Sequence, residues 1–495
     1  MSFNDATIQE INDVMTKAYK AFQEFKLIDG KRKGQFLRTI AQELDESREK
    51  LIQTAMRETN LPEPRLGGEF ARTTGQLRMF ASLVEEGSWV DARVDTAQPD
   101  RTPVPKPDIR KMLVPIGPVV VFGASNFPFA YSTVGGDTAS ALAAGCPVVV
   151  KGHPAHAETS HYVAECVYRA IEKTKMPDGS FGHVHGKGFE VGKGLVMHPF
   201  TKAVGFTGSY TGGKALFDMA NERKEPIPVF SEMGSTNPVF LLPSALKKRS
   251  EEIAKMYAAS ITLSTGQFCT NPGLLLGVKG NDFSGFASKL GSMMKEVPPS
   301  TMLHPGIANS FRKNRKEALE QKGVELVAES ITQPSQNEGN PTLASVTLQD
   351  FVNNEKLREE VFGPYSLLIQ GPSVEELDHA LDFLPGQLTA TIIGDDEDLK
   401  EYTDFIVRVR EKAGRLIING VPTGVEVCPS MHHGGPFPST TDSRFTSVGT
   451  DAIKRFARPV SFQNFPSFLL PDELKNENPL NIWRLLNSEW KKDKI

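Results

Sequence analysis

The sequence predicts an α/β protein that is built on two doubly wound parallel sheets. Short apolar segments alternate with helical segments over residues 112–232, and the same alternation returns over residues 237–431. Such alternation is typical of parallel strands that are joined by helices. The chain has 495 residues, of which 39% are hydrophobic, so it is long enough and apolar enough for two or three domains.

The N-terminal part, residues 7–86, is predicted to be helical because its apolar residues recur at helical spacing. The first set is Ile8, Ile11, Met15, Ala18 and Phe22, and the second is Phe36, Ile40, Leu44 and Leu51. Residues 96–108 hold four prolines, a density that predicts an extended crossing rather than a helix.

The first α/β unit follows this crossing. Its predicted strands are 113–123, 146–151, 202–206 and 228–232, and its predicted helices are 140–144, 156–174 and 214–223. Four polar residues stand at or just after predicted strand ends: Asn126, Lys151, Ser209 and Glu232. Ligands of such sheets bind outside the carboxyl ends of the strands, so these side chains are expected at one place.

The second α/β unit is predicted over residues 237–431. It contains a helix at 252–261 and strands at 274–278, 365–369, 388–393 and 414–419. The tail after Thr440 is rich in aromatic residues and is expected to pack against another surface, such as a second subunit.

The charge of the chain gives no reason to expect nucleic acid or a membrane as a partner. The 56 basic and 60 acidic residues leave a net charge of −4. The first 20 residues lack the apolar core of a secretory signal, and no segment has the ~18 consecutive apolar residues of a membrane span. A cytoplasmic protein is therefore expected.

The four cysteines, Cys146, Cys166, Cys269 and Cys428, lie far apart and include no C-x-x-C pair. This spacing predicts neither a disulfide framework nor a zinc site. Cys146 and Cys166 fall in a predicted strand and a predicted helix and are interpreted as core residues. The surroundings of Cys428 indicate no catalytic role.

Cys269 stands in a different context, the polar stretch Ser264–Gly273, with Gly266 and Gly273 on either side. Flanking glycines suggest tight backbone and the close approach of another molecule. A thiolate in such a setting is a candidate nucleophile, whereas the alternative for an isolated cysteine is a buried inert thiol.

Five sequence motifs around this cysteine resemble those of the aldehyde dehydrogenase superfamily, over nearly the full length of the chain. They are Asn126 after a strand, Lys151 at the end of the next, residues 206–213 (FTGSYTGG), residues 232–234 (EMG) with 266–269 (GQFC), and residues 360–364 (EVFGP). The resemblance implies a dinucleotide-binding domain over 1–98 and 116–236 and a catalytic domain over 237–439. It further implies bridging segments at 99–115 and 440–495 and a homo-oligomer, either a dimer or a tetramer.

The resemblance implies oxidation of an aldehyde to a carboxylic acid through a thioester. Cys269 would be the nucleophile, and the Asn126 amide with the Cys269 N–H would hold the oxyanion. Glu232 would activate water for hydrolysis. Alternatives are that Glu232 only pairs with a cation, that the enzyme transfers the acyl group to coenzyme A, or that the chain is a non-catalytic relative.

The resemblance also implies which residues bind the cofactor. Gly208, Ser209 and Gly213 form a glycine-rich turn before a helix and would approach the pyrophosphate. Glu360 would accept hydrogen bonds from the nicotinamide ribose, with Phe362 beside the ring.

Lys151 would meet the adenosine ribose of this cofactor. Three positions later stands Pro154, where NAD-specific members carry a glutamate that repels a 2′-phosphate. NADP is therefore expected to be accepted and preferred, with NAD usable.

The substrate expectation rests on residues 72–77, 151–153 and 433–438, which resemble a bacterial branch of the family. That branch oxidises 2,5-dioxopentanoate to 2-oxoglutarate or, alternatively, fatty aldehydes. Arg72 and Phe127 are the candidate substrate-binding residues, because arginine matches a carboxylate.

The histidine pairs His183 with His185 and His432 with His433 are interpreted as surface or loop residues, because no carboxylate-rich motif accompanies them. No metal site is predicted.

Overall fold

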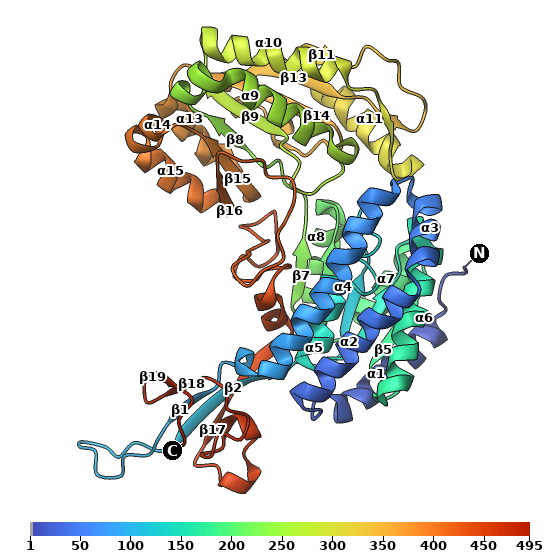
Figure 1. Cartoon of the computed structure of the whole chain (residues 1–495), viewed down its shortest axis with the longest axis vertical. Helices are drawn as coiled ribbons and strands as arrows, with labels where there is room; N and C mark the ends of the chain where they lie inside the picture. The colour runs from blue at the N-terminus through green and yellow to red at the C-terminus, as the bar shows by residue number, and fades with distance from the viewer. Residues whose placement is uncertain (1–2) are drawn as a thin grey trace.

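The computed structural model describes residues 3–495. Two α/β lobes lie one above the other along the long axis, and a small sheet extends from the lower lobe (Figure 1). Among the described residues, none of the helices is both long and apolar enough to cross a membrane.

The lower lobe is organised around a parallel sheet with the strand order β5-β4-β3-β6-β7. These strands are β3 (Val119–Phe122), β4 (Val148–Lys151), β5 (Phe181–Val184), β6 (Ala203–Thr207) and β7 (Val229–Glu232). The chain runs from β3 outward in one direction and later returns to its other side. This reversal opens a ligand site at the carboxyl edge of the sheet.

Helices cover both faces of this sheet: α1 (Ile8–Phe25), α2 (Gly30–Glu46), α3 (Arg48–Thr59), α4 (Glu63–Glu86), α5 (Gly136–Ala144), α6 (Ala157–Thr174), α7 (Phe189–Met197) and α8 (Tyr210–Asn221). Successive valines of β3 point to opposite faces because a strand is pleated. Val119 and Val121 join the core formed with α2 to α6, whereas Val120 packs with α1 and α7. The prediction of helices over residues 7–86 is confirmed.

The upper lobe contains a second sheet with the order β11-β13-β14-β9-β8-β15-β16, in which only β11 pairs antiparallel. The strands are β8 (Val239–Leu241), β9 (Leu274–Val278), β11 (Glu325–Glu329), β13 (Thr342–Thr347), β14 (Tyr365–Gly371), β15 (Gln387–Ile393) and β16 (Ala413–Ile418). The four strands predicted for this unit correspond to β9, β14, β15 and β16 and are confirmed.

The helices of the upper lobe are α9 (Pro243–Thr262), α10 (Asn281–Glu296), α11 (Pro305–Leu319), α12 (Leu348–Asn353), α13 (Val374–Ala380), α14 (Asp396–Glu401) and α15 (Thr403–Val409). A two-stranded ladder joins β10 (Ser300–Thr301) to β12 (Glu338–Gly339). The predicted helix at 252–261 is the second half of α9.

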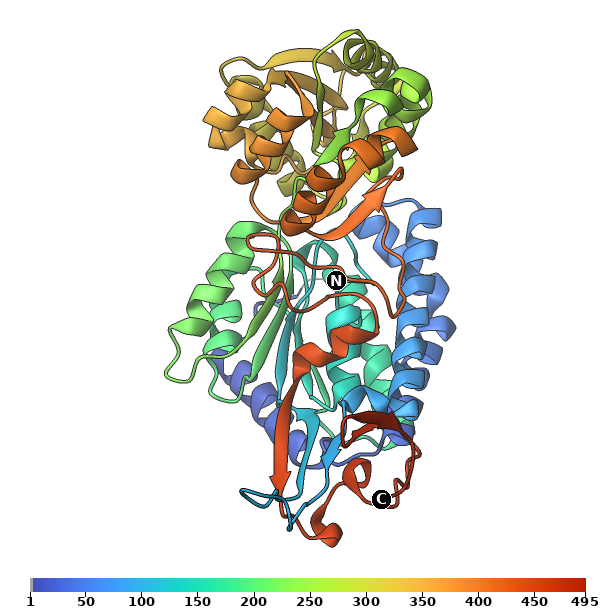
Figure 2. The same ribbon diagram turned by 90° about the vertical axis from the view of Figure 1, so that its left-hand side faces the viewer.

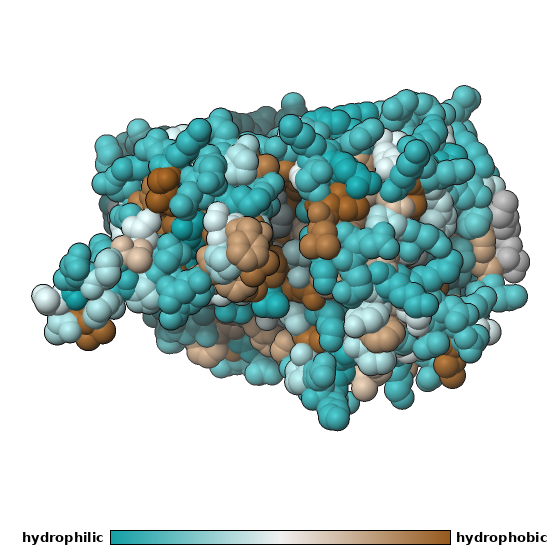
Figure 3. Space-filling view, turned by 90° about the horizontal axis from the view of Figure 1, so that it is seen from below, coloured by the Kyte–Doolittle hydropathy of each residue, from teal (hydrophilic) through white to brown (hydrophobic). Residues whose placement is uncertain are grey.

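A third sheet lies at the lower end, with the order β17-β2-β1-β18-β19. Its strands are β1 (Arg93–Asp95), β2 (Ile109–Pro115), β17 (Ala457–Gln463), β18 (Arg484–Leu486) and β19 (Glu489–Lys491). Residues 96–108 form an extended loop that projects from it (Figure 1). Seen from this end, apolar side chains emerge in an otherwise hydrophilic surface (Figure 3).

The prediction of one buried strand over residues 113–123 is wrong. The segment splits into β2 and β3, which belong to different sheets. Gly117 turns the chain between them at φ +126°, and a Cβ there would meet Lys202 at 2.7 Å. Pro115 and Pro118 on either side lack the N–H that a continuous ladder needs.

The segment after residue 431 returns from the upper lobe and crosses the carboxyl edge of the lower sheet (Figure 2). It is fixed to β7, because Met233 N donates to Ser439 O at 2.8 Å and Ser231 N donates to Thr441 Oγ1 at 3.0 Å. This segment therefore lies directly over Glu232, the last residue of β7.

Candidate active site

Cys269 lies in the loop that follows α9, at the junction of the two lobes. The backbone before it is left-handed at Ser264, Thr265 and Gly266, with φ of 48°, 58° and 63°. A Cβ at Gly266 would overlap the backbone carbonyl of Gly363. The glycine is thus needed for the loop to pass against residues 363–364 and present the thiol to the sheet edge.

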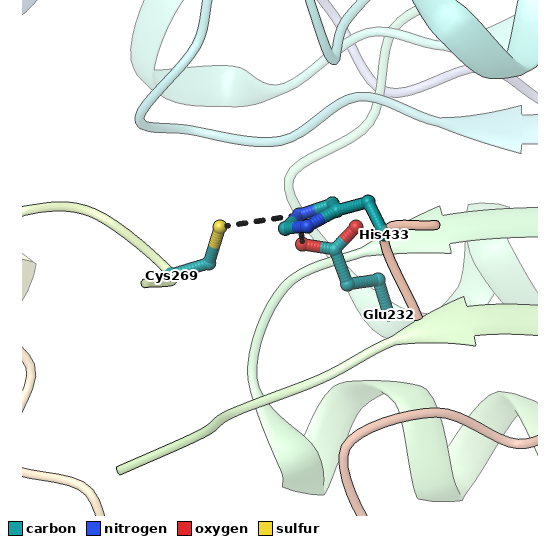
Figure 4. A group of neighbouring side chains, drawn as sticks. All are labelled: Glu232, Cys269 and His433. Atoms are coloured by element: carbon teal, nitrogen blue, oxygen red, sulfur yellow. Dashed lines mark hydrogen bonds and ion pairs between the residues drawn. The ribbon is translucent and has the colours of Figure 1, made fainter. Parts of the chain in front are cut away.

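Three side chains meet at this edge. Nε2 of His433 lies 3.6 Å from Sγ of Cys269 and 2.9 Å from Oε1 of Glu232 (Figure 4). The other carboxylate oxygen of Glu232 accepts a 2.6 Å hydrogen bond from Ser447 Oγ. The side chains of His433 and Glu232 are 0% and 2% exposed, so these two groups are shielded from water, whereas Cys269 is half-buried.

Burial and neighbouring groups shift the proton equilibria of this chain. Burial works to raise the pKa of Glu232, but His433 and the Ser447 hydroxyl outweigh it and the pKa is lowered, so the carboxylate is ionised. Burial raises the pKa of the Cys269 thiol well above its ordinary value, and the negative charge of Glu232 raises it further. The resting cysteine is therefore a neutral thiol that needs a base.

The interpretation of the four histidines as surface or loop residues is wrong for His183, which lies on a strand, whereas His185, His432 and His433 lie in irregular segments. His433 is fully buried, and its backbone N–H donates to Thr446 Oγ1 at 2.8 Å. His183 lies on β5 and contacts Ser160 Oγ at 2.7 Å. His185 directly follows β5 and stacks on Phe3 with ring centroids 3.9 Å apart. Sequence spacing carried no signal for His433, because its partners Cys269 and Glu232 are 164 and 201 positions away.

Asn126, half-buried after β3, is brought to the cysteine loop. Its Nδ2 donates to the carbonyl of Gln267, two residues before the thiol, at 3.3 Å. Arg65 of α4 donates to the carbonyl of Asn126 at 3.4 Å and lies over the ring of Phe127 at 4.3 Å. Asn126 and Glu232, two of the four residues that the strand ends predicted at one place, therefore both lie beside the cysteine loop.

An apolar cluster of side chains, the chamber, packs beside this group. Its buried members are Ala124, Phe127, Ala130, Tyr131 and Val448, with Phe268, Val425, Val427 and Met431 packed beside them. Phe127 lies 5.7 Å from Phe268, between ring centroids. Arg72 of α4 donates to the hydroxyl of Tyr131 at 2.9 Å, which places its guanidinium at the wall of the chamber.

The glycine-rich turn between β6 and α8 has the features of a phosphate cradle. Ser209 caps α8 by accepting from Gly212 N at 3.2 Å. A Cβ at Gly213 would meet Met233 at 2.6 Å, so the glycine lets α8 approach β7 closely. Exposed backbone N–H groups and the helix dipole at this end suit an anionic pyrophosphate.

The other predicted cofactor residues lie on both lobes. Lys151 ends β4, and Pro154 opens the following turn. Glu360 and Phe362 line a small cavity with Phe268 in the upper lobe, and a Cβ at Gly234 would meet Oε2 of Glu360 at 2.6 Å. Burial raises the pKa of Glu360 to about 8. The residues present fit a dinucleotide that spans the two lobes.

The interpretation of Cys146 and Cys166 as core residues is confirmed. Cys146 and Cys166 are free and buried in the lower core. Cys146 lies just before β4 rather than within it. Cys428 is half-buried in the segment beside the chamber.

The comparisons with known proteins agree with this geometry. The model of the aldehyde dehydrogenase family matches residues 1–459. The chain is 44% identical to alpha-ketoglutaric semialdehyde dehydrogenase of Acinetobacter baylyi over 486 residues, covering 98% of this chain and 92% of that protein. It is 45% identical to alpha-ketoglutaric semialdehyde dehydrogenase 2 of Azospirillum brasilense over 483 residues, with the same coverage.

The fold is also shared with solved structures. Glyceraldehyde-3-phosphate dehydrogenase of Methanocaldococcus jannaschii, complexed with NADP, superposes with a TM-score of 0.78 at 18% identity, covering 93% of this chain and 95% of that one. With its two lobes, its half-buried cysteine at their junction and a family match along nearly its full length, the chain belongs to the aldehyde dehydrogenase family.

Proposed function

We propose that this NAD(P)-dependent aldehyde dehydrogenase oxidises 2,5-dioxopentanoate to 2-oxoglutarate through a thioester at Cys269. The observation that carries the proposal is the contact of Sγ with His433, which in turn contacts Glu232. The substrate follows from the two relatives of 44% and 45% identity, which are named for this semialdehyde. The cofactor would bind to residues 1–98 and 116–236, and residues 237–439 would carry the nucleophile.

The first step is activation of the thiol. The carboxylate of Glu232, which lies within 4.8 Å of Sγ, accepts the proton of Cys269, and the thiolate attacks the aldehyde carbon to form a hemithioacetal. Nε2 of His433 donates its N–H to Oε1 of Glu232 at 2.9 Å, so this nitrogen positions the carboxylate and does not itself accept the thiol proton. The raised pKa of the thiol keeps it neutral until this transfer.

The oxyanion of the hemithioacetal is held by Asn126 Nδ2 and by the backbone N–H of Cys269. A nicotinamide dinucleotide held by Lys151, Ser209 and Glu360 would supply the hydride acceptor, so that two electrons leave the substrate carbon and a thioester remains on Sγ. After Glu232 has released its first proton to solvent, its carboxylate removes a proton from water, whose oxygen attacks the thioester carbon and releases the acid and the thiol. A base beside the thiol favours hydrolysis over transfer to coenzyme A.

NADP is proposed as the preferred cofactor, with NAD usable. Pro154 offers neither a charge nor an acceptor where a glutamate would repel a 2′-phosphate. Lys151 is half-buried at the end of β4 and is the nearby cation that a phosphate would meet.

The protein is proposed to act in the cytoplasm, where its four free cysteines would stay reduced.

A fatty aldehyde is the second candidate substrate. The apolar chamber around Phe127, Tyr131 and Phe268 favours it, because these side chains offer more contact to a hydrocarbon chain than to a carboxylate.

Steady-state kinetics decide between the two substrates. Reduced-cofactor formation is measured with 2,5-dioxopentanoate and with hexanal, each with NADP and NAD. We expect kcat/KM to be higher for 2,5-dioxopentanoate. A preference for hexanal would discard the proposed substrate and the assignment of Arg72 to its carboxylate. Absence of turnover with every aldehyde would point to a non-catalytic relative.

A further inference from the structure

Two arginines at the chamber have no carboxylate partner. Arg72 of α4 donates to Tyr131 OH at 2.9 Å. Arg415 of β16 donates to the carbonyls of Pro422 at 2.7 Å and Gly424 at 3.1 Å. Within residues 3–495, neither guanidinium forms an ion pair, although the charge of Glu69 also acts on Arg72.

Each of the two guanidiniums also has an unused donor. Nε of Arg72 and Nε of Arg415 are buried and find no acceptor among the described residues. A buried donor without a partner costs about 1–3 kcal/mol, so such groups are usually satisfied by something. Nε of Arg65, on the same helix as Arg72, is also buried without an acceptor among the described residues, but Arg65 differs in that its guanidinium pairs with Glu69 at 2.7 Å.

The two arginines approach the chamber from different lobes. Tyr131, which Arg72 holds, lies 5.1 Å from Phe127 and 6.4 Å from His433 between ring centroids. Arg415 holds the loop that continues into Val425 and Val427, and both valines pack in the cluster of Phe127 and Tyr131.

The electrostatics agree with this placement. Burial lowers the pKa of Arg415, and Cys269 and Tyr131 work to raise it, so the guanidinium lies within their field. Burial raises the pKa of the Cys269 thiol, and Arg72 is the neighbour that works to lower it. The charges of both arginines therefore act on Sγ of Cys269, the atom that attacks the aldehyde.

We propose that Arg72 and Arg415 together bind the acid end of the substrate, which restricts the enzyme to semialdehydes that carry a carboxylate. This inference rests on the proposed oxidation at Cys269. The two guanidiniums present donors from opposite lobes to one carboxylate and the adjacent 2-oxo group. The apolar wall between them and the thiol contacts the methylene carbons, and the aldehyde at the other end of the chain reaches Sγ.

A substrate series tests this pair of arginines, Arg72 and Arg415, as a clamp for the acid end of the substrate. The five-carbon aldehydes 2,5-dioxopentanoate, 5-oxopentanoate and pentanal differ only in the 2-oxo and carboxylate groups. In Arg72→Met and in Arg415→Met, the ratio of kcat/KM for 5-oxopentanoate to that for pentanal should fall by about 30-fold or more, mainly through KM. Arg415→Lys should recover part of the ratio. Arg444→Met is the matched control, because this exposed arginine pairs with Asp442.

The outcomes separate the inference from the function on which it rests. If wild-type enzyme does not prefer the acids to pentanal, the proposed substrate is wrong. If it does but the Arg415→Met ratio stays within about twofold of wild type, the role of Arg415 is to anchor the loop at Pro422 and the clamp is overturned. Inhibition of pentanal turnover by 2-oxoglutarate gives a second measurement, since weaker inhibition in both variants is expected and unchanged inhibition would overturn the proposal.

Discussion

At the scale of single residues, the environment of Cys269 keeps the thiol protonated at rest, although attack on the aldehyde needs the thiolate. A thiol beside a carboxylate is a poor nucleophile, and its raised pKa protects it from reaction in the absence of substrate. The carboxylate of Glu232, within 4.8 Å of Sγ, is the base that attack needs. Glu232 therefore raises the thiol pKa in the resting state and removes the thiol proton during attack.

This dual role of Glu232 leads to two opposite effects of Glu232→Gln. Removing its negative charge should lower the thiol pKa, so alkylation of Cys269 by iodoacetamide should become faster at pH 8. Steady-state turnover should fall by about 10²–10⁴-fold because the base for hydrolysis is lost. In wild type, the alkylation rate should keep rising with pH up to at least pH 9, since the thiol pKa is well above its ordinary value of 9.0.

Mass spectrometry of the labelled cysteine gives the alkylation rate at each pH. Cys428→Ser is the control, and its profile should match wild type. Slower alkylation in Glu232→Gln at every pH would contradict the electrostatic role of the carboxylate.

Cofactor preference is a second property of single residues. Asp5 accepts from Lys187 N at 2.8 Å and from Gly188 N at 3.2 Å, which fixes its carboxylate beyond the end of β5. β5 pairs with β4, and the charge of Asp5 acts on Lys151. The negative charge of Asp5 would repel the 2′-phosphate of NADP, whereas the uncharged Pro154 would not.

Two substitutions should therefore move the preference in opposite directions. Asp5→Asn should raise the ratio of kcat/KM with NADP to that with NAD by a few-fold at low salt, whereas Pro154→Glu should lower it by about tenfold or more. Asp178→Asn, which removes another exposed carboxylate, is the control. A large NAD preference in wild type would mean that Lys151 serves only the ribose hydroxyls.

At the scale of elements, the backbone of the cysteine loop depends on Gly266. Gly266→Ala should cost at least about 1–3 kcal/mol, because alanine is strained at φ +63° and its Cβ would overlap the Gly363 carbonyl. The midpoint of thermal unfolding and the turnover rate should both fall. Gly75→Ala is the matched control, since Gly75 is helical with open space around it and should gain about 0.5–1 kcal/mol. Equal midpoints for both variants would contradict the strain argument.

The same scale decides how much could be predicted from the sequence. The strands with continuous valine or leucine runs, such as β4 and β9, were predictable because burial on both faces leaves a local pattern. β8 and β11 were not, since β8 has only three residues and β11 is an exposed edge strand. Asn126 and Glu232 were found from strand ends, whereas His433 comes from an irregular segment that only the tertiary fold carries to the sheet.

At the scale of the whole molecule, the free strand edges and exposed apolar residues are candidate subunit contacts. β17 and β16 are edge strands of their sheets and present unpaired backbone groups. Leu416 and Ile418 of β16 are exposed, as are Phe468, Leu469 and Trp490 near the small sheet. Exposed apolar residues beside free strand edges are typical of subunit contacts.

We therefore expect a homo-oligomer, a dimer or a tetramer, whose interface involves the small sheet. Phe468 and Leu469 are 82% and 55% exposed, so replacing both with glutamate should leave the fold intact while introducing two charges into an interface of about 800 Å² per partner or more. Light scattering at micromolar concentration should give a smaller mass for this double variant than for wild type. Ile8→Glu is the control, because Ile8 is 87% exposed on α1 and lies away from the tail. A wild-type mass of 54.3 kDa would contradict the assembly, because the exposed strand edges and aromatic side chains would then be free in solution.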